Sequence, residues 1–132
     1  MVDEADIERL RAGYDAFNRG DYEAVLRNFD PAVEFRDRAE VPDPRTYQGH
    51  GGVLSQFTAI GSEFKDYRIE PLGFEVVGEE HLVATVRQSG TGRASGVPVE
   101  ETLFHLWHLD AGRVIHMRAF SSRQAAVEAI PG

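Results

Sequence analysis

One carboxylate in this sequence stands where an apolar side chain is expected. Between residues 32 and 37 apolar and polar side chains alternate as in a β-strand, and Val33, Phe35 and Asp37 share the otherwise apolar face. An unpaired carboxylate on an apolar wall costs several kcal/mol unless it protonates or finds a donor. Asp37 is therefore a candidate for general acid–base chemistry. The structural alternatives are a cap on the loop over residues 38–46 and an ion pair with Arg36 or Arg38 on the outside.

Two further side chains could act beside such a carboxylate. His105 shares one face of an expected strand with Leu103 and Trp107, and Arg87 lies on the strand before it. When a carboxylate removes a proton next to a carbonyl, an imidazole or a guanidinium can stabilise the developing oxyanion. The alternatives are a core histidine bonded to a backbone carbonyl and an arginine stretched along the surface.

Other kinds of chemistry have less support. The five histidines include no i, i+4 pair, so no metal site is expected, and the absence of cysteine excludes disulfides and thiolate chemistry. The glycine-rich stretch over residues 90–96 leads into a strand rather than a helix, which disfavours a phosphate loop. No Gly-x-Ser-x-Gly elbow occurs. We expect no cofactor.

The elements that position these residues follow from hydrophobic periodicity. Helical spacing predicts a helix over 3–18, capped by Asp3, then a short helix capped by Asp21, and a third helix that follows residues 47–52 and carries Phe57. After residue 66 the period changes to two. Strands are predicted over 67–77, 81–89, 97–109 and 113–121, and a short helix over 122–129.

Short turns between these strands imply antiparallel neighbours. The fold class predicted is α+β: a cone-shaped roll in which three N-terminal helices pack on a curved antiparallel sheet, with a pocket between the two layers. At 132 residues the chain fits one domain, residues 1–132. Strand parity cannot decide which face of the last two strands looks into the pocket.

Composition limits the partners. The net charge of −8 disfavours nucleic acid and anionic membrane surfaces, and no apolar run approaches the roughly 20 residues of a membrane span. The acidic start of the chain lacks the pattern of a secretion signal, so a cytoplasmic location is expected. Apolar residues on the outer sheet face need covering, which predicts a homodimer. They are Phe104, Leu106, Val114 and Phe120.

Segments along essentially the whole chain resemble the SnoaL-like branch of the nuclear transport factor 2-like superfamily. They are Tyr14–Asp21, Phe29–Phe35, Tyr47–Val53, Gly112–Ile115 and Ala125–Ala129. The resemblance implies the cone-shaped fold but no single function. The superfamily contains ketosteroid isomerases, polyketide cyclases, limonene epoxide hydrolases, dehydratases and binding domains without catalytic activity.

The resemblance also implies roles for particular residues. Asp37 matches the general base of ketosteroid isomerases and His105 matches their oxyanion-stabilising acid, whereas Ala119 stands where epoxide hydrolases and SnoaL-type cyclases have an aspartate. The remaining predicted residues form a substrate-binding wall. They are Tyr14, Phe17, Phe35, Phe57, Arg87, Trp107 and Met117.

These observations predict a cofactor-free acid–base enzyme of the isomerase, cyclase or dehydratase type. Its substrate would be a small apolar molecule with a carbonyl group. Two alternatives stay open: a binding protein that holds a small hydrophobic ligand without turnover, and a dimerisation module of a larger assembly.

Overall fold

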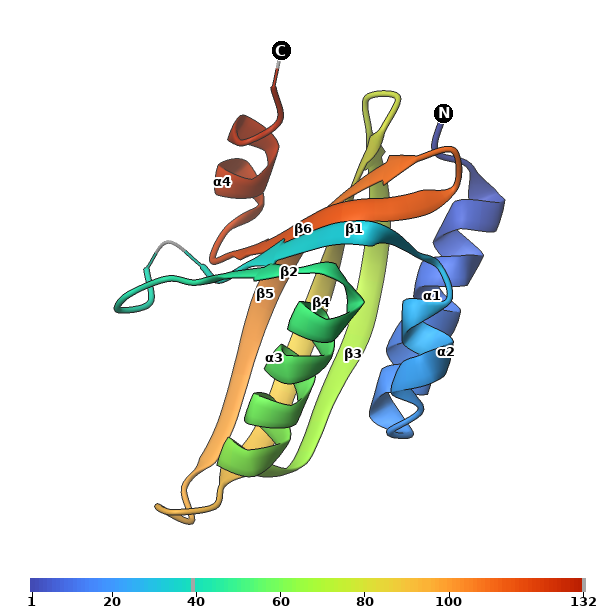
Figure 1. Ribbon diagram of the computed structural model, residues 1–132. Helices are drawn as coiled ribbons and strands as arrows, with labels where there is room; N and C mark the ends of the chain where they lie inside the picture. The colour runs from blue at the N-terminus through green and yellow to red at the C-terminus, as the bar shows by residue number, and fades with distance from the viewer. Residues whose placement is uncertain (39, 132) are drawn as a thin grey trace.

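Three helices lie on one side of a strongly bent sheet in the computed structural model, which describes residues 1–38 and 40–131 (Figure 1). They are α1 (Glu4–Asn18), α2 (Tyr22–Leu26) and α3 (Gly49–Glu63). A fourth helix, α4 (Arg123–Glu128), packs on the opposite side, against the last three strands. The layers are those predicted, so the α+β fold class is confirmed.

The sheet has six strands in the order β2-β1-β6-β5-β4-β3. The strands are β1 (Phe29–Arg36), β2 (Thr46–Gln48), β3 (Phe64–Val77), β4 (His81–Gly92), β5 (Pro98–Asp110) and β6 (Arg113–Phe120). Four neighbouring pairs are antiparallel as predicted, whereas β1 and β6 run parallel, so the sheet is mixed at this one pair. Short turns fix only the pairing of consecutive strands, and β1 and β6 are joined through most of the chain.

Helix starts agree with the capping residues in the sequence. Asp3 and Asp6 form a reciprocal capping box at α1, and the Asp21 side chain accepts a hydrogen bond from a backbone N–H at the start of α2. The strand β2 was not predicted, since three residues show too little periodicity. It pairs with the end of β1 and leads directly into α3.

A β-bulge corrects the prediction for Val114, which is fully buried in the core and not on the outer sheet face. His108 pairs with His116, but the next residue on β5, Leu109, pairs with Val114, which leaves Ile115 as an extra residue on β6. A bulge of this kind reverses the alternation of the residues beyond it. Strand parity counted from Met117 therefore assigns Val114 to the wrong face.

The outer face of the sheet is partly covered by α4. Leu106 and Val83 are buried there together with Ala126 of α4, and Phe104 and Phe120 pack around this cluster while half-buried. The homodimer stays a prediction. Within residues 1–38 and 40–131, no helix combines the length and apolar character that crossing a membrane requires.

Candidate functional site

A pocket of about 1200 Å³ opens between the helices and the concave face of the sheet. Organic ligands of drug size are usually held in pockets of roughly 300–1,000 Å³, so this pocket is large enough for one. Six of the seven residues predicted to bind substrate line it. They are Tyr14, Phe17, Phe35, Phe57, Trp107 and Met117.

Aromatic side chains from both layers form most of the apolar lining. Phe17 of α1 and Phe57 of α3 meet edge to face, with ring centroids 5.0 Å apart. Phe35 of β1 meets Trp107 of β5 in the same way at 5.9 Å. Such rings offer a hydrophobic and geometrically defined surface. The wall therefore suits an apolar ligand.

A chain of buried hydrogen bonds crosses the inner end of the pocket. Trp107 Nε1 donates to Tyr14 Oη over 2.9 Å, and Tyr14 Oη lies 2.7 Å from His105 Nδ1. His105 and Trp107 occupy alternate positions of β5 and so share its inner face, while Tyr14 reaches them from α1. Three residues that the sequence places on two distant elements thus form one hydrogen-bonded unit.

The donors in this chain set the tautomer of His105. The indole N–H of Trp107 can only donate, so Tyr14 Oη accepts this hydrogen bond. The Tyr14 hydroxyl in turn donates its proton to His105 Nδ1, which is its one acceptor among the described residues. We therefore assign the imidazole proton to Nε2. His105 Nε2 has no hydrogen-bond partner among the described residues. It is nevertheless accessible, because Asn28 Nδ2 is the one fully buried side-chain atom of the described residues that lacks a hydrogen-bond partner.

Burial keeps both groups of this pair neutral. It lowers the pKa of His105 to about 4. It also raises the pKa of Tyr14 far above its ordinary value, although the hydrogen bond from Trp107 opposes this shift. At neutral pH the pocket thus carries an uncharged imidazole with an N–H donor. A donor of this kind can stabilise an oxyanion without itself being a cation.

Asp37 lies at the mouth of the pocket, where it is partly exposed to solvent, and not on a wall that excludes water. The residue is half-buried just beyond the end of β1, and its Oδ2 accepts a hydrogen bond of 3.0 Å from the backbone N–H of Arg45. The expectation of an unpaired, buried carboxylate is therefore wrong, because the loop after β1 folds back and supplies a donor. Asp37 still lines the same pocket as His105.

Strand register relates the two predicted catalytic residues. Arg36 pairs with Arg118 on β6, so the next residue, Asp37, comes level with Ala119, and Ala119 pairs with His105. Two strand spacings separate the Cα atoms of Asp37 and His105 by roughly 10 Å. The small side chain of Ala119 lies between them on the pocket wall. This arrangement leaves space for a substrate between a carboxylate and an imidazole.

Arg87 is not part of the pocket. Its side chain is exposed on the other face of β4 and its Nε lies 3.2 Å from Glu100. Its neighbours Val86 and Gln88 point inward: Val86 is fully buried and Gln88 lines the pocket. The prediction that Arg87 binds substrate is thus corrected, since it rested on residue type and not on strand parity.

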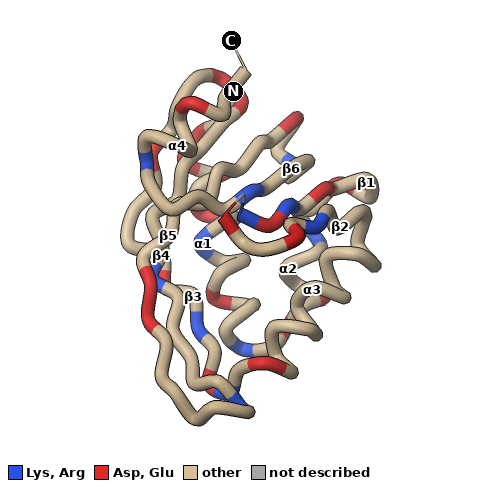
Figure 2. Tube along the Cα trace, turned by 90° about the vertical axis from the view of Figure 1, so that its left-hand side faces the viewer, with Lys and Arg blue, Asp and Glu red and all other residues tan. Residues whose placement is uncertain are grey.

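Polar residues at the outer part of the pocket were not predicted. Tyr67 and Gln88 line it from β3 and β4, and Arg38 from the loop after β1. Acidic and basic residues follow one another along that loop (Figure 2). The alternation of β4 could have identified Gln88, but no local signal in the sequence shows that Tyr67 reaches it.

Comparison with known proteins places this geometry in a family. The model of the SnoaL-like domain matches residues 10–117. The chain belongs to the SnoaL-like domain family. No curated protein with significant sequence similarity was found.

Solved structures of SnoaL-like proteins and their relatives share the fold. An NTF2-like protein from Burkholderia thailandensis E264 is 24% identical with a TM-score of 0.79, over 96% of this chain and 98% of that one. A protein of ketosteroid isomerase-like fold from Catenulispora acidiphila DSM 44928, crystallised with trimethylamine, is 11% identical with a TM-score of 0.76, over 94% and 98%. TerC, co-crystallised with polyporic acid, is 22% identical with a TM-score of 0.76, over 93% and 95%. At these identities the likeness concerns the fold.

Proposed function

We propose that this SnoaL-like protein catalyses proton transfer next to the carbonyl group of a small apolar substrate, without a cofactor. The observation that carries the proposal is the hydrogen-bonded series Trp107–Tyr14–His105, which presents a neutral N–H donor to the pocket. His105 lies level with Asp37 across the sheet, with Ala119 between them. An isomerase or a cyclase both need this combination of base and oxyanion donor.

The chemical step uses two residues in different roles. The Asp37 carboxylate takes a proton from the carbon beside the carbonyl, and the electron pair of that C–H bond moves to form an enolate. The enolate oxygen accepts a hydrogen bond from His105 Nε2–H, and the proton then returns from Asp37 to carbon. A neutral imidazole suits this role, because its N–H is too weakly acidic to ionise at neutral pH and so remains a hydrogen-bond donor throughout.

The surroundings of these two groups support the assignment. Tyr14 and Trp107 hold the His105 ring in one orientation, so its donor does not need to reorganise during the reaction. The backbone N–H of Arg45 holds the carboxylate of Asp37 at the pocket mouth. The apolar lining between them favours a substrate that is mostly hydrocarbon.

Exchange of substrate protons with solvent tests this proposal without knowledge of the natural substrate. 2-Tetralone, a cyclic apolar ketone, is incubated with the protein in D₂O, and loss of its α-proton signals is followed by NMR. We expect the wild-type protein to accelerate exchange and Asp37→Asn to abolish the acceleration. Asp30→Asn is the matched control, since Asp30 also accepts a backbone N–H on β1 but does not line the pocket. Equal rates with and without protein would contradict the proposal.

A binding protein without turnover is the second candidate. The observation that favours it is the partly exposed position of Asp37 and its bond to Arg45, which suit a loop cap as well as a base. In that case 2-tetralone would bind with saturation while its exchange rate in D₂O would equal that of the protein-free solution.

A further inference from the structure

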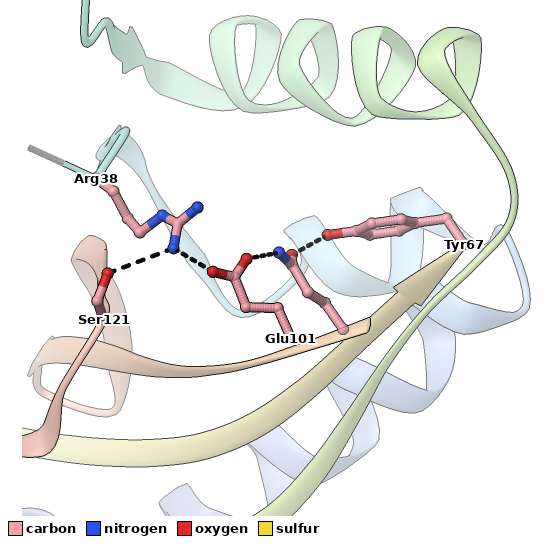
Figure 3. A network of polar contacts seen from close by, with 5 residues as sticks. Arg38, Tyr67, Glu101 and Ser121 are labelled. Atoms are coloured by element: carbon pink, nitrogen blue, oxygen red, sulfur yellow. Dashed lines mark hydrogen bonds and ion pairs between the residues drawn. The ribbon is translucent and has the colours of Figure 1, made fainter. Parts of the chain in front are cut away.

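Tyr67, Gln88 and Arg38 of the pocket lining belong to a second network of polar side chains, whose contacts are drawn as dashed lines in Figure 3. Tyr67 Oη is 2.6 Å from Gln88 Oε1, Gln88 Nε2 is 2.9 Å from Glu101 Oε1, and Arg38 Nη1 is 2.8 Å from Glu101 Oε2. Arg38 also reaches Ser121 Oγ at 3.4 Å. The five residues come from five strands or the segments that follow them, so the fold assembles this network and no local motif does.

The carboxylate of Glu101 determines which way each donor points. An ionised carboxylate only accepts, so it receives the N–H groups of Arg38 and Gln88. The Gln88 amide therefore turns its oxygen toward Tyr67, and the Tyr67 hydroxyl donates to it. Burial, with a smaller contribution from Glu101, raises the pKa of Tyr67 to about 12, so this hydroxyl keeps its proton at neutral pH.

The remaining hydrogen-bonding capacity at this end differs from that at His105. Tyr67 has used its one proton, so its oxygen can only accept a further hydrogen bond, and Gln88 Nε2 retains a second N–H. A hydroxyl group on a ligand can donate to Tyr67 and accept from Gln88 at once. A carbonyl or an ether would leave the Tyr67 oxygen without a donor. His105 Nε2–H at the other end instead requires an acceptor.

The position of Tyr67 is held by packing. Gly90 lies opposite on β4, and a Cβ atom there would come 3.2 Å from Tyr67 Cδ1, so the absence of a side chain lets the tyrosine ring approach the strand. The ring also meets Phe17 edge to face at 6.1 Å. These two contacts help to fix the orientation of the Tyr67 ring.

Strand register gives the separation of the two ends. Gln88 pairs with Glu101 and Ala84 pairs with His105, four residues further along the same two strands. At about 3.4 Å per residue this amounts to roughly 13 Å. The inner face between them carries Val86 and Leu103, both buried and apolar.

We infer that the ligand is a flat hydroxy ketone whose carbonyl oxygen accepts from His105 and whose hydroxyl, at the opposite end, bonds Tyr67 and Gln88. Allowing a hydrogen bond of about 3 Å at each end, the two oxygens lie roughly 8–13 Å apart. This is the length of about two or three fused six-membered rings with bonds near 1.5 Å. The inference rests on the proposed function for the His105 end and adds Tyr67 as a specificity-determining residue.

Two ketones that differ only at the far end test this inference. The probes are 6-acetyl-2-naphthol and its methyl ether, 2-acetyl-6-methoxynaphthalene, and binding is measured by fluorescence or calorimetry. The wild-type protein is expected to bind the hydroxy ketone about three- to tenfold more tightly, the effect of one neutral hydrogen bond. Tyr67→Phe should bring the ratio of the two dissociation constants to about one. Tyr22→Phe, which alters a neighbour of Phe17 that is not among the residues lining the pocket, should leave it unchanged.

The possible failures are separable. Equal affinities in the wild-type protein, a preference that persists in Tyr67→Phe, or no saturable binding of either ketone would each overturn the inference. 2-Tetralone has no hydroxyl, so its exchange in D₂O depends on Asp37 and does not require the Tyr67 oxygen. If 2-tetralone exchanges rapidly but the wild-type protein does not prefer the hydroxy ketone, this inference alone is overturned. If exchange is not accelerated, the proposed function is overturned.

Discussion

Acidification should destabilise the protein through His105. The pKa of this buried imidazole is about 4 in the folded protein, whereas an unfolded chain gives a value near 6.5. Above about pH 6.5 the side chain is neutral in the folded and in the unfolded protein, so its titration does not change the free energy of unfolding. As pH falls below 6.5 the unfolded chain binds a proton that the folded protein excludes, so stability is lost until pH reaches about 4.

The magnitude follows from the two pKa values. A difference of about 2.5 units at 1.36 kcal/mol each corresponds to a total loss of about 3 kcal/mol. By pH 5 about 2 kcal/mol of this is already lost, because the unfolded chain is then almost fully protonated at this position and the folded protein hardly at all. That is a large part of the 5–15 kcal/mol typical of small domains.

Urea unfolding of two proteins at two pH values isolates this effect. The wild-type protein and His105→Gln are compared at pH 7.5 and pH 5, since glutamine does not titrate and keeps an acceptor for the Tyr14 hydroxyl. Contributions from other histidines cancel in the difference between the two proteins. We expect the wild-type protein to lose about 2 kcal/mol more than the variant.

Equal losses in the two proteins would refute the reasoning. If His105→Gln does not fold, the ring proton signals of His105 in the wild-type protein provide the same test. Their titration midpoint should lie near pH 4. A midpoint near 6.5 would show that burial does not act on this group as inferred.

Three further outcomes are expected. Tyr14→Phe should lower the free energy of unfolding by about 2–4 kcal/mol, because it leaves Trp107 Nε1–H and His105 Nδ1 unpaired. A loss no larger than that of Tyr22→Phe in urea titrations would count against the buried hydrogen bonds. Asp37→Asn should change stability by less than about 1 kcal/mol, because the amide oxygen can still accept from Arg45, and a larger loss by thermal unfolding would indicate a structural role for the charge. Light scattering at high concentration should give the mass of two 14.7 kDa chains, and the mass of one chain would contradict the predicted homodimer.

The sequence predicts most of the fold because its periodic signals are long and local. Helical spacing locates α1, and the change to period two locates β3 to β6. The features it does not predict depend on non-local pairing: the parallel contact of β1 with β6, the three-residue strand β2, and the bulge at Ile115 that turns Val114 inward. None of these leaves a repeated pattern in the chain.

The candidate site was predictable only in part, and for the same reason. Strand alternation predicts that His105 and Trp107 share one face, and the family resemblance predicts that His105 faces the pocket, but their hydrogen bonds to Tyr14 span more than 90 positions of the chain. Asp37 was placed on the correct face, while the donor that binds it comes from the folded-back loop. Arg87 was chosen by residue type, although alternation from Val86 would have excluded it.

The most direct test of the proposed chemistry is the ¹⁵N and ¹H NMR spectrum of the His105 ring, with and without 2-naphthol as an analogue of the enolate. The proposal predicts at neutral pH a ring protonated at Nε2 alone, with Nδ1 accepting from Tyr14. On addition of 2-naphthol the Nε2–H signal should move downfield as the ligand oxygen binds it. A proton on Nδ1, or an Nε2–H signal that 2-naphthol at saturating concentration leaves unchanged, would contradict the assignment of His105 as the oxyanion donor.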